Sequence, residues 1–421
     1  MNSPAPLAGP RRAALVFILV TVAIDILSFG IIIPVLPKLV VDFVGSEADG
    51  ARMFGWFSMA WATMQFIFSP LLGAISDRYG RRPVILISCF GLGVDFLVMA
   101  LAPNLAWLFA GRLVSGICAA SFSTAGAYIA DVTPAEKRAT AFGMMGVAFG
   151  IGFVVGPFIG GELGALSPRA PFWAAACLAL VNACYGVFVL PESLPTERRG
   201  GFSWARANPL GSLKLLRSHH ELFGFAGVSF LANLAHVVLP STTVLYMGYR
   251  YHWDARDVGR VLGLVGICSA IVQGGLIRPA VKRFGERKAM LFGLACGTVG
   301  FMIYGLAPTG TWFLVAIPIM AFWGLAMPSL QSLMTQRVSP TEQGQLQGAN
   351  SALIGIAGMI GPGLFTQTFA HFIDPVGLQL PGAPYYIASL LLFVGLILAW
   401  RITRYAAAAA DVATAAAATE S

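Results

Sequence analysis

The stretch Gly73-Ala-Ile-Ser-Asp77-Arg78-Tyr-Gly80-Arg81-Arg82-Pro83 decides how the rest of the chain is organised. This polar run separates two apolar stretches, residues 56–72 and 84–101, and each of them is long enough to cross a bilayer. We therefore interpret the run as a tight loop that joins two membrane spans. Its two glycines permit close helix approach and a sharp turn. Its arginines favour the cytoplasmic side of the membrane.

The composition indicates a membrane protein. Of 421 residues, 57% are hydrophobic and 11% are charged, and the mean hydropathy is +0.76. Long apolar runs recur along the whole chain without the alternation of barrel strands, so we expect transmembrane helices. The first run, from about residue 13 to residue 36, is too long for a signal peptide and is interpreted as a retained span.

Several classes of site are not expected. The net charge of +8 comes from Lys and Arg that are dispersed among loops, which argues against a nucleic-acid surface. The six cysteines lie inside apolar runs without the spacing of a metal site or a disulfide framework, so we interpret them as small core residues. Neither a phosphate-binding lysine motif nor a catalytic triad is present, so we expect no cofactor and no enzyme activity.

We predict an all-α polytopic fold of twelve transmembrane helices in two six-helix bundles, residues 12–191 and 220–402. A cytoplasmic linker, residues 192–219, would join them, and the alanine-rich tail, residues 403–421, is expected to be disordered. The predicted spans are approximately residues 13–36, 53–75, 83–102, 105–129, 140–163, 170–191, 221–245, 257–279, 288–307, 311–334, 345–370 and 383–401.

An internal repeat supports the two bundles. Residues 283–287 repeat the Arg-x-Gly-x-Arg spacing of residues 78–82, and Gly361-Pro362 answers Gly156-Pro157. Such repeats are typical of secondary transporters. Alternating the loops places 20 of the 27 Lys and Arg on the face that holds the N-terminus. The positive-inside rule then predicts an inner (plasma) membrane protein with both termini in the cytoplasm.

Three charged residues lie inside predicted spans: Asp25, Asp95 and Arg112. Counted from the periplasmic ends of their spans, all three are about 12–14 Å deep, so adjacent helices could bring them together. Two interpretations remain open. A static ion pair would hold the bundle. Alternatively, a carboxylate exchanges its proton during transport, with Asp25 the better candidate because it is the only ionisable group in its span. Asp95 could carry a proton, meet a cationic substrate or pair with Arg112.

Span 5 is rich in glycine. Gly152, Gly156 and Gly160 stand four residues apart on one face, which permits close helix contact, and Pro157 should bend the helix. Either simple packing or a pliable helix at a moving interface would explain this pattern. Other polar groups inside spans are expected to form helix-to-helix hydrogen bonds, and a few are candidates to line a cavity: Gln65, Asn233, His236 and Gln273.

These motifs together resemble the major facilitator superfamily. The loop at residues 73–83 is similar to its signature between spans 2 and 3, and the span 5 glycines are similar to the antiporter signature of proton-driven drug exporters. With Gly111-Arg112, residues 127–131 and residues 344–348, the pattern is most similar to the tetracycline efflux proteins, over about residues 12–402. The resemblance implies proton-coupled export of a drug by alternating access, without a cofactor and as a monomer.

The resemblance also implies roles for individual residues. Asp25 and Asp95 match membrane-embedded aspartates of the tetracycline exporters. Asp77, Arg81 and Asp131 would form a charge relay that latches the outward-facing state, although solvated loop charges remain an alternative. One departure stands out, because those exporters also carry an aspartate in span 9. Here that span has no acidic residue, and Gly297 stands near the matching place.

The missing carboxylate weakens the case for a magnesium–tetracycline chelate as substrate, since such a cation favours carboxylates. An exporter of broader drug or metabolite specificity is therefore an alternative. A proton- or sodium-coupled importer would share the fold. A membrane receptor or scaffold that transports nothing is a third class, which buried Asp25 and Asp95 argue against.

Overall fold

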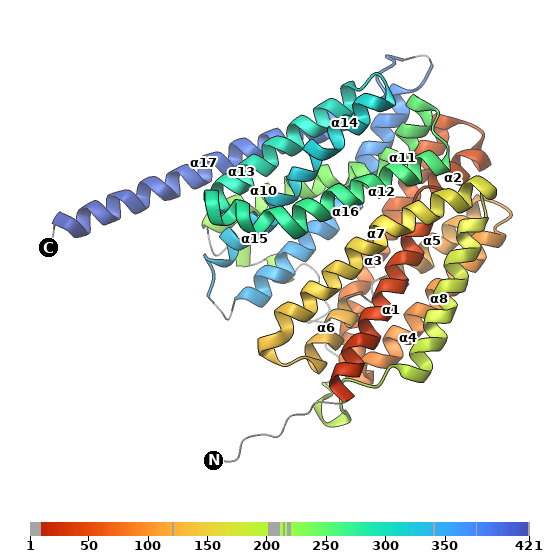
Figure 1. The fold of residues 1–421 in the computed structure, drawn as a ribbon, viewed down its shortest axis with the longest axis horizontal. Helices are drawn as coiled ribbons and strands as arrows, with labels where there is room; N and C mark the ends of the chain where they lie inside the picture. Colours follow the sequence, from red (N-terminus) through yellow and green to blue (C-terminus); the bar gives the residue numbers. More distant parts are fainter. Residues whose placement is uncertain are drawn as a thin grey trace. The chain divides into compact units, whose positions relative to one another are not determined.

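The computed structural model describes residues 10–119, 122–200, 211–213, 215–216, 220–339, 342–375 and 377–419. Every regular element in these residues is a helix, which confirms the predicted all-α class (Figure 1). The helices before the linker are α1 (Pro10–Ile32), α2 (Leu36–Val44), α3 (Glu47–Tyr79), α4 (Arg81–Leu101), α5 (Leu105–Ala119), α6 (Phe122–Val132), α7 (Arg138–Leu166) and α8 (Ala170–Val189).

The helices after the linker include two short irregular turns, η4 and η5. They are α10 (His220–His236), α11 (Val238–Tyr251), α12 (Ala255–Ile271), η4 (Val272–Leu276), α13 (Ile277–Leu306), α14 (Gly310–Ala321), η5 (Phe322–Leu325), α15 (Ala326–Thr335), α16 (Gln343–Phe372) and α17 (Ala383–Thr419).

The helices account for the predicted number of membrane crossings. Within the described residues, eleven helical segments are long and apolar enough to span a bilayer. One of them, Ala255–Leu306, has 52 residues and covers two predicted spans, 257–279 and 288–307. Gly285 divides it with a non-helical backbone, φ 78° and ψ 161°. The twelve-helix prediction is therefore supported.

Contacts within the chain define two compact units. Unit 1 comprises Met1–Pro209 and Met247–Gly266, and unit 2 comprises Leu210–Tyr246 and Ile267–Ser421. The first boundary falls inside the predicted linker, of which residues 201–210, 214 and 217–219 lie outside the described residues. The segment Met247–Gly266 belongs to unit 1, whereas we expected it in the second bundle.

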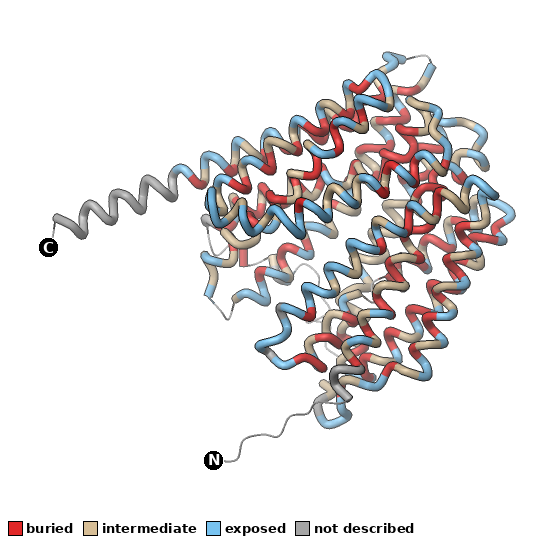
Figure 2. Tube along the Cα trace, viewed as in Figure 1, coloured by how far each residue is buried: buried red, intermediate tan, exposed pale blue. Residues whose placement is uncertain are grey.

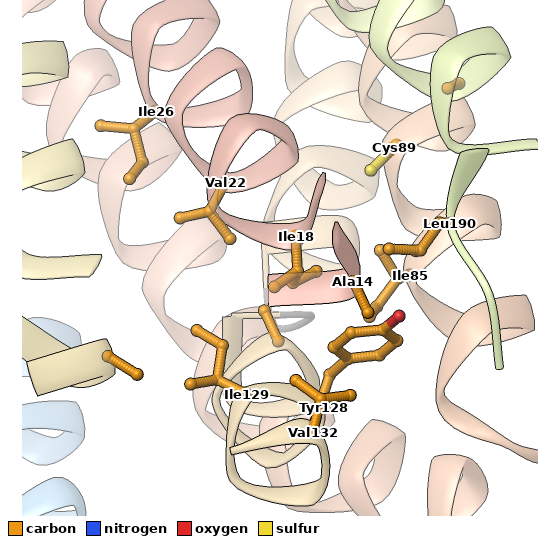
Figure 3. Close-up of a cluster of buried hydrophobic side chains, with 13 residues drawn as sticks. Ala14, Ile18, Val22, Ile26, Ile85, Cys89, Tyr128, Ile129, Val132 and Leu190 are labelled. Carbon is orange, nitrogen blue, oxygen red and sulfur yellow. The ribbon is translucent and has the colours of Figure 1, made fainter. Parts of the chain in front are cut away.

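Unit 1 is built around one face of α1. Ala14, Ile18, Val22 and Ile26 follow one another at intervals of four residues, which places them on the same side of the helix. They pack with a cluster of buried side chains from α4, α6 and the end of α8, including Tyr128 (Figure 3). Close side-chain packing is the main force that holds helices together in lipid, and this seam provides it.

The outward surfaces are apolar as well. Ile87 is 71% exposed, Phe188 is 87% exposed and Trp56 is 57% exposed. Figure 2 shows exposed positions along the outer sides of the helices and buried positions on their inner sides. Exposed side chains of this kind would be unfavourable in water, but in a membrane their surroundings are lipid tails. The protein is thus a multi-pass membrane protein.

The alanine-rich tail differs from the expectation of disorder. The helix α17 continues through it to Thr419, and only the last two residues lie outside the described part. Alanine has the highest intrinsic helix propensity, so a run of alanines prolongs a helix that packing has already nucleated.

Candidate functional site

Asp25 is buried in unit 1 and is held by neutral hydrogen-bond donors. Asn182 of α8 donates from Nδ2 to Oδ1 at 2.8 Å, and the thiol of Cys89 on α4 donates to Oδ2 at 3.3 Å. Asn182 also donates to the carbonyl of Thr21, one turn before Asp25, at 3.0 Å. Neutral donors orient the carboxylate, but they do not neutralise a negative charge in the membrane interior. The arrangement therefore suits a carboxyl group that binds a proton.

Sequence reasoning missed the role of Cys89, which we had interpreted only as a small core residue. Asn182 is one of the other polar groups inside spans that we expect to form helix-to-helix hydrogen bonds, and it forms them between α8 and α1. A thiol–carboxylate contact between residues 25 and 89 depends on how α1 and α4 pack, and neither residue lies in a recognisable motif. No signal in the sequence therefore pointed to it.

Asp95 on α4 and Arg112 on α5 form a second buried cluster. They are only 1% and 5% exposed, respectively. They attract each other electrostatically, yet both oxygens of Asp95 and the Nε and Nη1 atoms of Arg112 have no hydrogen-bond partner among the described residues. Ser115 is near enough to stabilise the carboxylate, but neither group reaches hydrogen-bond geometry. Buried polar atoms without partners are rare and costly, so this cluster is well suited to take up a proton or a polar ligand.

An aromatic ring covers Arg112. Its guanidinium carbon lies 5.3 Å from the centre of the Trp61 ring, a cation–π distance. Asp95 lies close to the backbone of Gly111, the residue before Arg112. A Cβ added at Gly111 would lie 2.7 Å from Oδ1 of Asp95. Of the three residues that we expected at one depth, the structure thus associates Asp95 with Arg112. Asp25 has Asn182 and Cys89 as its hydrogen-bond partners instead.

The loop predicted at residues 73–83 is shorter in the structure, because α3 continues to Tyr79 and α4 begins at Arg81. Arg81 is buried there and joins both predicted acids. Its Nη1 lies 2.5 Å from Asp77 Oδ1, and its Nε lies 3.2 Å from Asp131 Oδ2 on α6. Nη1 also donates to Ser76 at 2.6 Å. The three residues of the proposed charge relay are therefore in mutual contact through one guanidinium group.

Glu192, just after α8, completes this cluster, and sequence reasoning missed it. Its Oε1 accepts from the backbone N–H of Arg81 at 2.9 Å, and its Oε2 accepts from that of Arg82 at 3.3 Å. The side chain of Arg199 adds a cation 3.9 Å from Oε2. The carboxylate thus caps the positive end of α4. The sequence did offer one signal, because Glu192 lies in the predicted linker, which is expected on the same cytoplasmic face as the loop at residues 73–83.

The two loop glycines have different roles. Gly80 has φ 107° and ψ 155°, a conformation that essentially only glycine adopts, and an added Cβ would collide with the Glu192 carboxylate. An added Cβ at Gly73 would meet nothing within 4 Å. The expected close approach at Gly73 is therefore not present. Of the remaining loop cations, Arg78 is exposed and lies 5.2 Å from the ring of Tyr79, and Arg82 is half-buried and donates from Nη2 to the carbonyl of Val187 at 2.6 Å.

The glycine face of α7 lies against α1, the helix that carries Asp25. An added Cβ at Gly156 would lie 2.7 Å from the Cα of Gly30, and one at Gly152 would lie 2.5 Å from the side chain of Ile26. At Gly160 it would overlap the carbonyl oxygen of Ile31. Pro157 lies within the same helix. The small residues therefore let α7 touch the backbone of α1.

The candidate cavity residues are dispersed. Gln65 is half-buried on α3 of unit 1. In unit 2, Asn233 donates to the carbonyl of Ser229 on its own helix at 2.8 Å, so this amide joins no second helix. The His236 ring lies 5.6 Å from the ring of Trp323, and Gln273 lies beside Gly324. His236 and Gln273 thus both border η5.

The structure gives a physical reason for the departure in span 9. Gly297 is buried, and an added Cβ would lie 2.8 Å from Cγ of Trp323 and 2.7 Å from a methyl group of Leu392. The indole of Trp323 therefore occupies the space that a side chain at residue 297 would need. Among the described residues, no group of three or more His, Cys, Asp or Glu side chains could hold a metal ion.

Comparisons with known proteins agree with this architecture. The family model of the Major Facilitator Superfamily matches residues 18–362 and 276–419. The class C tetracycline resistance protein of Escherichia coli is 40% identical over 360 residues, 85% of this chain and 90% of that protein. The class G protein of Vibrio anguillarum is 36% identical over 362 residues, 85% of this chain and 91% of that protein.

A solved structure shows the same fold. The human organic anion transporter MFSD10 (TETRAN) aligns with a TM-score of 0.69 at 24% identity, covering 93% of this chain and 99% of that one. These matches extend over both predicted bundles. The chain is therefore a transporter that belongs to the Major Facilitator Superfamily and, within it, to the family of the tetracycline resistance proteins.

Proposed function

We propose that the protein exports a drug of the tetracycline type in exchange for protons, by alternating access, from the cytoplasm across the inner membrane with both termini in the cytoplasm. Its relatives named tetracycline resistance proteins support drug efflux. The observation that carries proton coupling is the environment of Asp25, a buried carboxyl group with only neutral hydrogen-bond donors. Such a group is most stable in a membrane when it is protonated, and it releases its proton when water reaches it.

In this mechanism the two acids have different roles. Asp25 binds the transported proton on α1, while α7 moves along the glycine contacts at Gly156 and Gly160. Asp95 and Arg112 have buried polar atoms without partners, so they can receive a polar group of the substrate. Arg81 holds Asp77 and Asp131 together in one state of the cycle and releases them in another. The contacts of Arg81, Asp77 and Asp131 thus form in one conformation and break in the other, so that the equilibrium between the two conformations is reversible.

A broader specificity than tetracycline is the second candidate. The space in which the tetracycline exporters place a span 9 aspartate is filled here by Trp323, packed against Gly297. An aromatic wall favours flat lipophilic drugs and gives no ligand to a magnesium ion. The fold and the proton-binding residues are unaffected by this choice of substrate.

Uptake of labelled tetracycline into everted membrane vesicles, energised by a proton gradient, tests the proposal. We expect uptake by the native protein to be abolished by an uncoupler and by Asp25→Asn. Asp49→Asn is the matched control, because this exposed acid forms an ion pair with nearby Arg52 at the start of α3 and its loss should leave uptake unchanged.

The outcomes separate the candidates. If tetracycline is not taken up but other lipophilic cations enter and release protons, the exporter has the broader specificity. If a solute moves in the opposite direction, the protein is an importer. Uptake that continues at the native rate in the folded Asp25→Asn variant refutes the role of Asp25 in proton coupling.

A further inference from the structure

Unit 2 contains an open cavity of about 480 Å³ at its surface, between α13 and α15, and no residue of the candidate site lines it. Its volume is within the range of small-ligand pockets. One part of the wall is apolar and consists of Ile277, Val281 and Pro328. The other part carries the cations Arg278 and Lys282 and the hydroxyl of Ser329. The cavity therefore combines an apolar side with a cationic side.

The cations of this cavity are available to a ligand. Arg278 and Lys282 are four residues apart, so they point to the same side of α13, and both are exposed. In the described part of the chain, neither forms an ion pair. The one acid in the lining, Glu286, accepts hydrogen bonds from two neutral donors, Ser332 and Gln336, the latter at 2.7 Å, and its single negative charge stands against the two cations. The lining therefore keeps a net positive charge.

The serine is a second, independent indication of a ligand. Ser329 is 2% exposed, and in the part of the chain that the structure describes its Oγ has no hydrogen-bond partner. A serine on a helix ordinarily donates to the carbonyl one turn earlier, as Thr335 does to Gln331 at 2.8 Å on the same helix. A buried hydroxyl that makes no such bond retains a donor for an acceptor within the cavity.

We propose that this cavity binds the headgroup phosphate of an anionic phospholipid. Arg278 and Lys282 contact the phosphate, Ser329 donates a hydrogen bond to it, and an acyl chain lies along Ile277, Val281 and Pro328. A small hydrated anion would gain nothing from contact with the apolar wall. A cationic drug would be repelled by Arg278 and Lys282. The predicted orientation places these residues at the cytoplasmic leaflet, where basic pockets between helices recognise acidic headgroups.

Native mass spectrometry of the purified, delipidated full chain tests the proposal by titration with phosphatidylglycerol. Each basic residue near an anionic surface contributes enough to change binding by about fivefold, so Arg278→Gln with Lys282→Gln should weaken the tightest-bound lipid on the order of 25-fold. Ser329→Ala should weaken it at least about 10-fold, as expected for loss of one hydrogen bond to a charged acceptor. Phosphatidylcholine has the same phosphate but adds a choline cation that Arg278 and Lys282 would repel, so it should bind the native protein more weakly than phosphatidylglycerol and lose less affinity in these variants.

The matched control removes two exposed cations of the same unit that do not line the cavity, Lys288→Gln with Arg404→Gln. Equal weakening in this control would show a general charge effect and would overturn the proposal. So would native-like affinity in the folded Arg278/Lys282 variant. If inorganic phosphate binds as tightly as the lipid and is lost in the same variants, the site takes free phosphate and the lipid assignment is wrong.

Discussion

Glu192→Gln is the substitution that most directly tests how the α3–α4 junction is held. The carboxylate accepts hydrogen bonds from the backbone N–H groups of Arg81 and Arg82 at the start of α4. Its Oε1 also accepts from Ser193 and Leu194, each at 3.0 Å. Glutamine keeps the shape and one acceptor but replaces the other oxygen with an amide donor, which would face the N–H of Arg82 and the guanidinium of Arg199.

The magnitude follows from these contacts. A hydrogen bond to a charged group contributes about 1.5–3 kcal/mol, against about 0.5–1.5 kcal/mol for a neutral one. The helix N-terminus adds about 0.3–1 kcal/mol for a negative charge. The side chain of Glu192 is 27% exposed, so solvent screens part of this difference. We expect a loss of about 1–2 kcal/mol in the free energy of local opening, a factor of roughly 5–30 in the opening equilibrium.

Hydrogen exchange measured by mass spectrometry reads this opening directly. Peptides covering residues 76–84 should exchange roughly 5–30 times faster in Glu192→Gln than in the native protein, while peptides from unit 2 should be unchanged. Glu197→Gln is the control, because it changes an exposed acid five residues further along the same segment. Equal exchange of residues 76–84 in the native protein and Glu192→Gln would refute the capping role.

Three further substitutions test the packing of the site by thermal unfolding of the purified protein. Gly80→Ala should cost about 1–3 kcal/mol because of its backbone conformation, whereas Gly73→Ala, in open space within α3, should be neutral or slightly stabilising; equal midpoints would contradict this. Gly160→Ala should lower the free energy of unfolding by about 1–3 kcal/mol, because the added methyl group overlaps the Ile31 carbonyl. Gly150→Ala, on the same helix, meets nothing within 4 Å and should unfold at the native midpoint. Gly297→Ala should lower the midpoint because the indole of Trp323 and a methyl group of Leu392 fill the space, whereas Gly274→Ala, which meets nothing within 4 Å, should not. A Gly297→Ala protein as stable as the native chain would show that the space is open.

The sequence by itself was sufficient for the class of fold. Apolar runs of bilayer length can only be helices in lipid, because each backbone polar group must be satisfied within its own segment. That local rule predicted the helical fold and the number of spans, and the relatives confirmed the superfamily. Residues 73–83 were also informative alone, since a short charged run between two spans has few possible structures. Arg81 forms ion pairs with Asp77 and Asp131 in the structure, and their role as a charge relay stays a prediction.

Only the tertiary structure decided which side chains meet. Equal depth suggested one group of Asp25, Asp95 and Arg112, but depth does not specify the rotation of a helix about its axis. That rotation gives Asp25 the thiol of Cys89 and the amide of Asn182. It also places Asp95 where Arg112 attracts it electrostatically, without a hydrogen bond between the two side chains. Likewise, the cap on α4 comes from Glu192, 111 residues away from Arg81. Contacts between residues so distant in sequence depend on packing that no local pattern encodes.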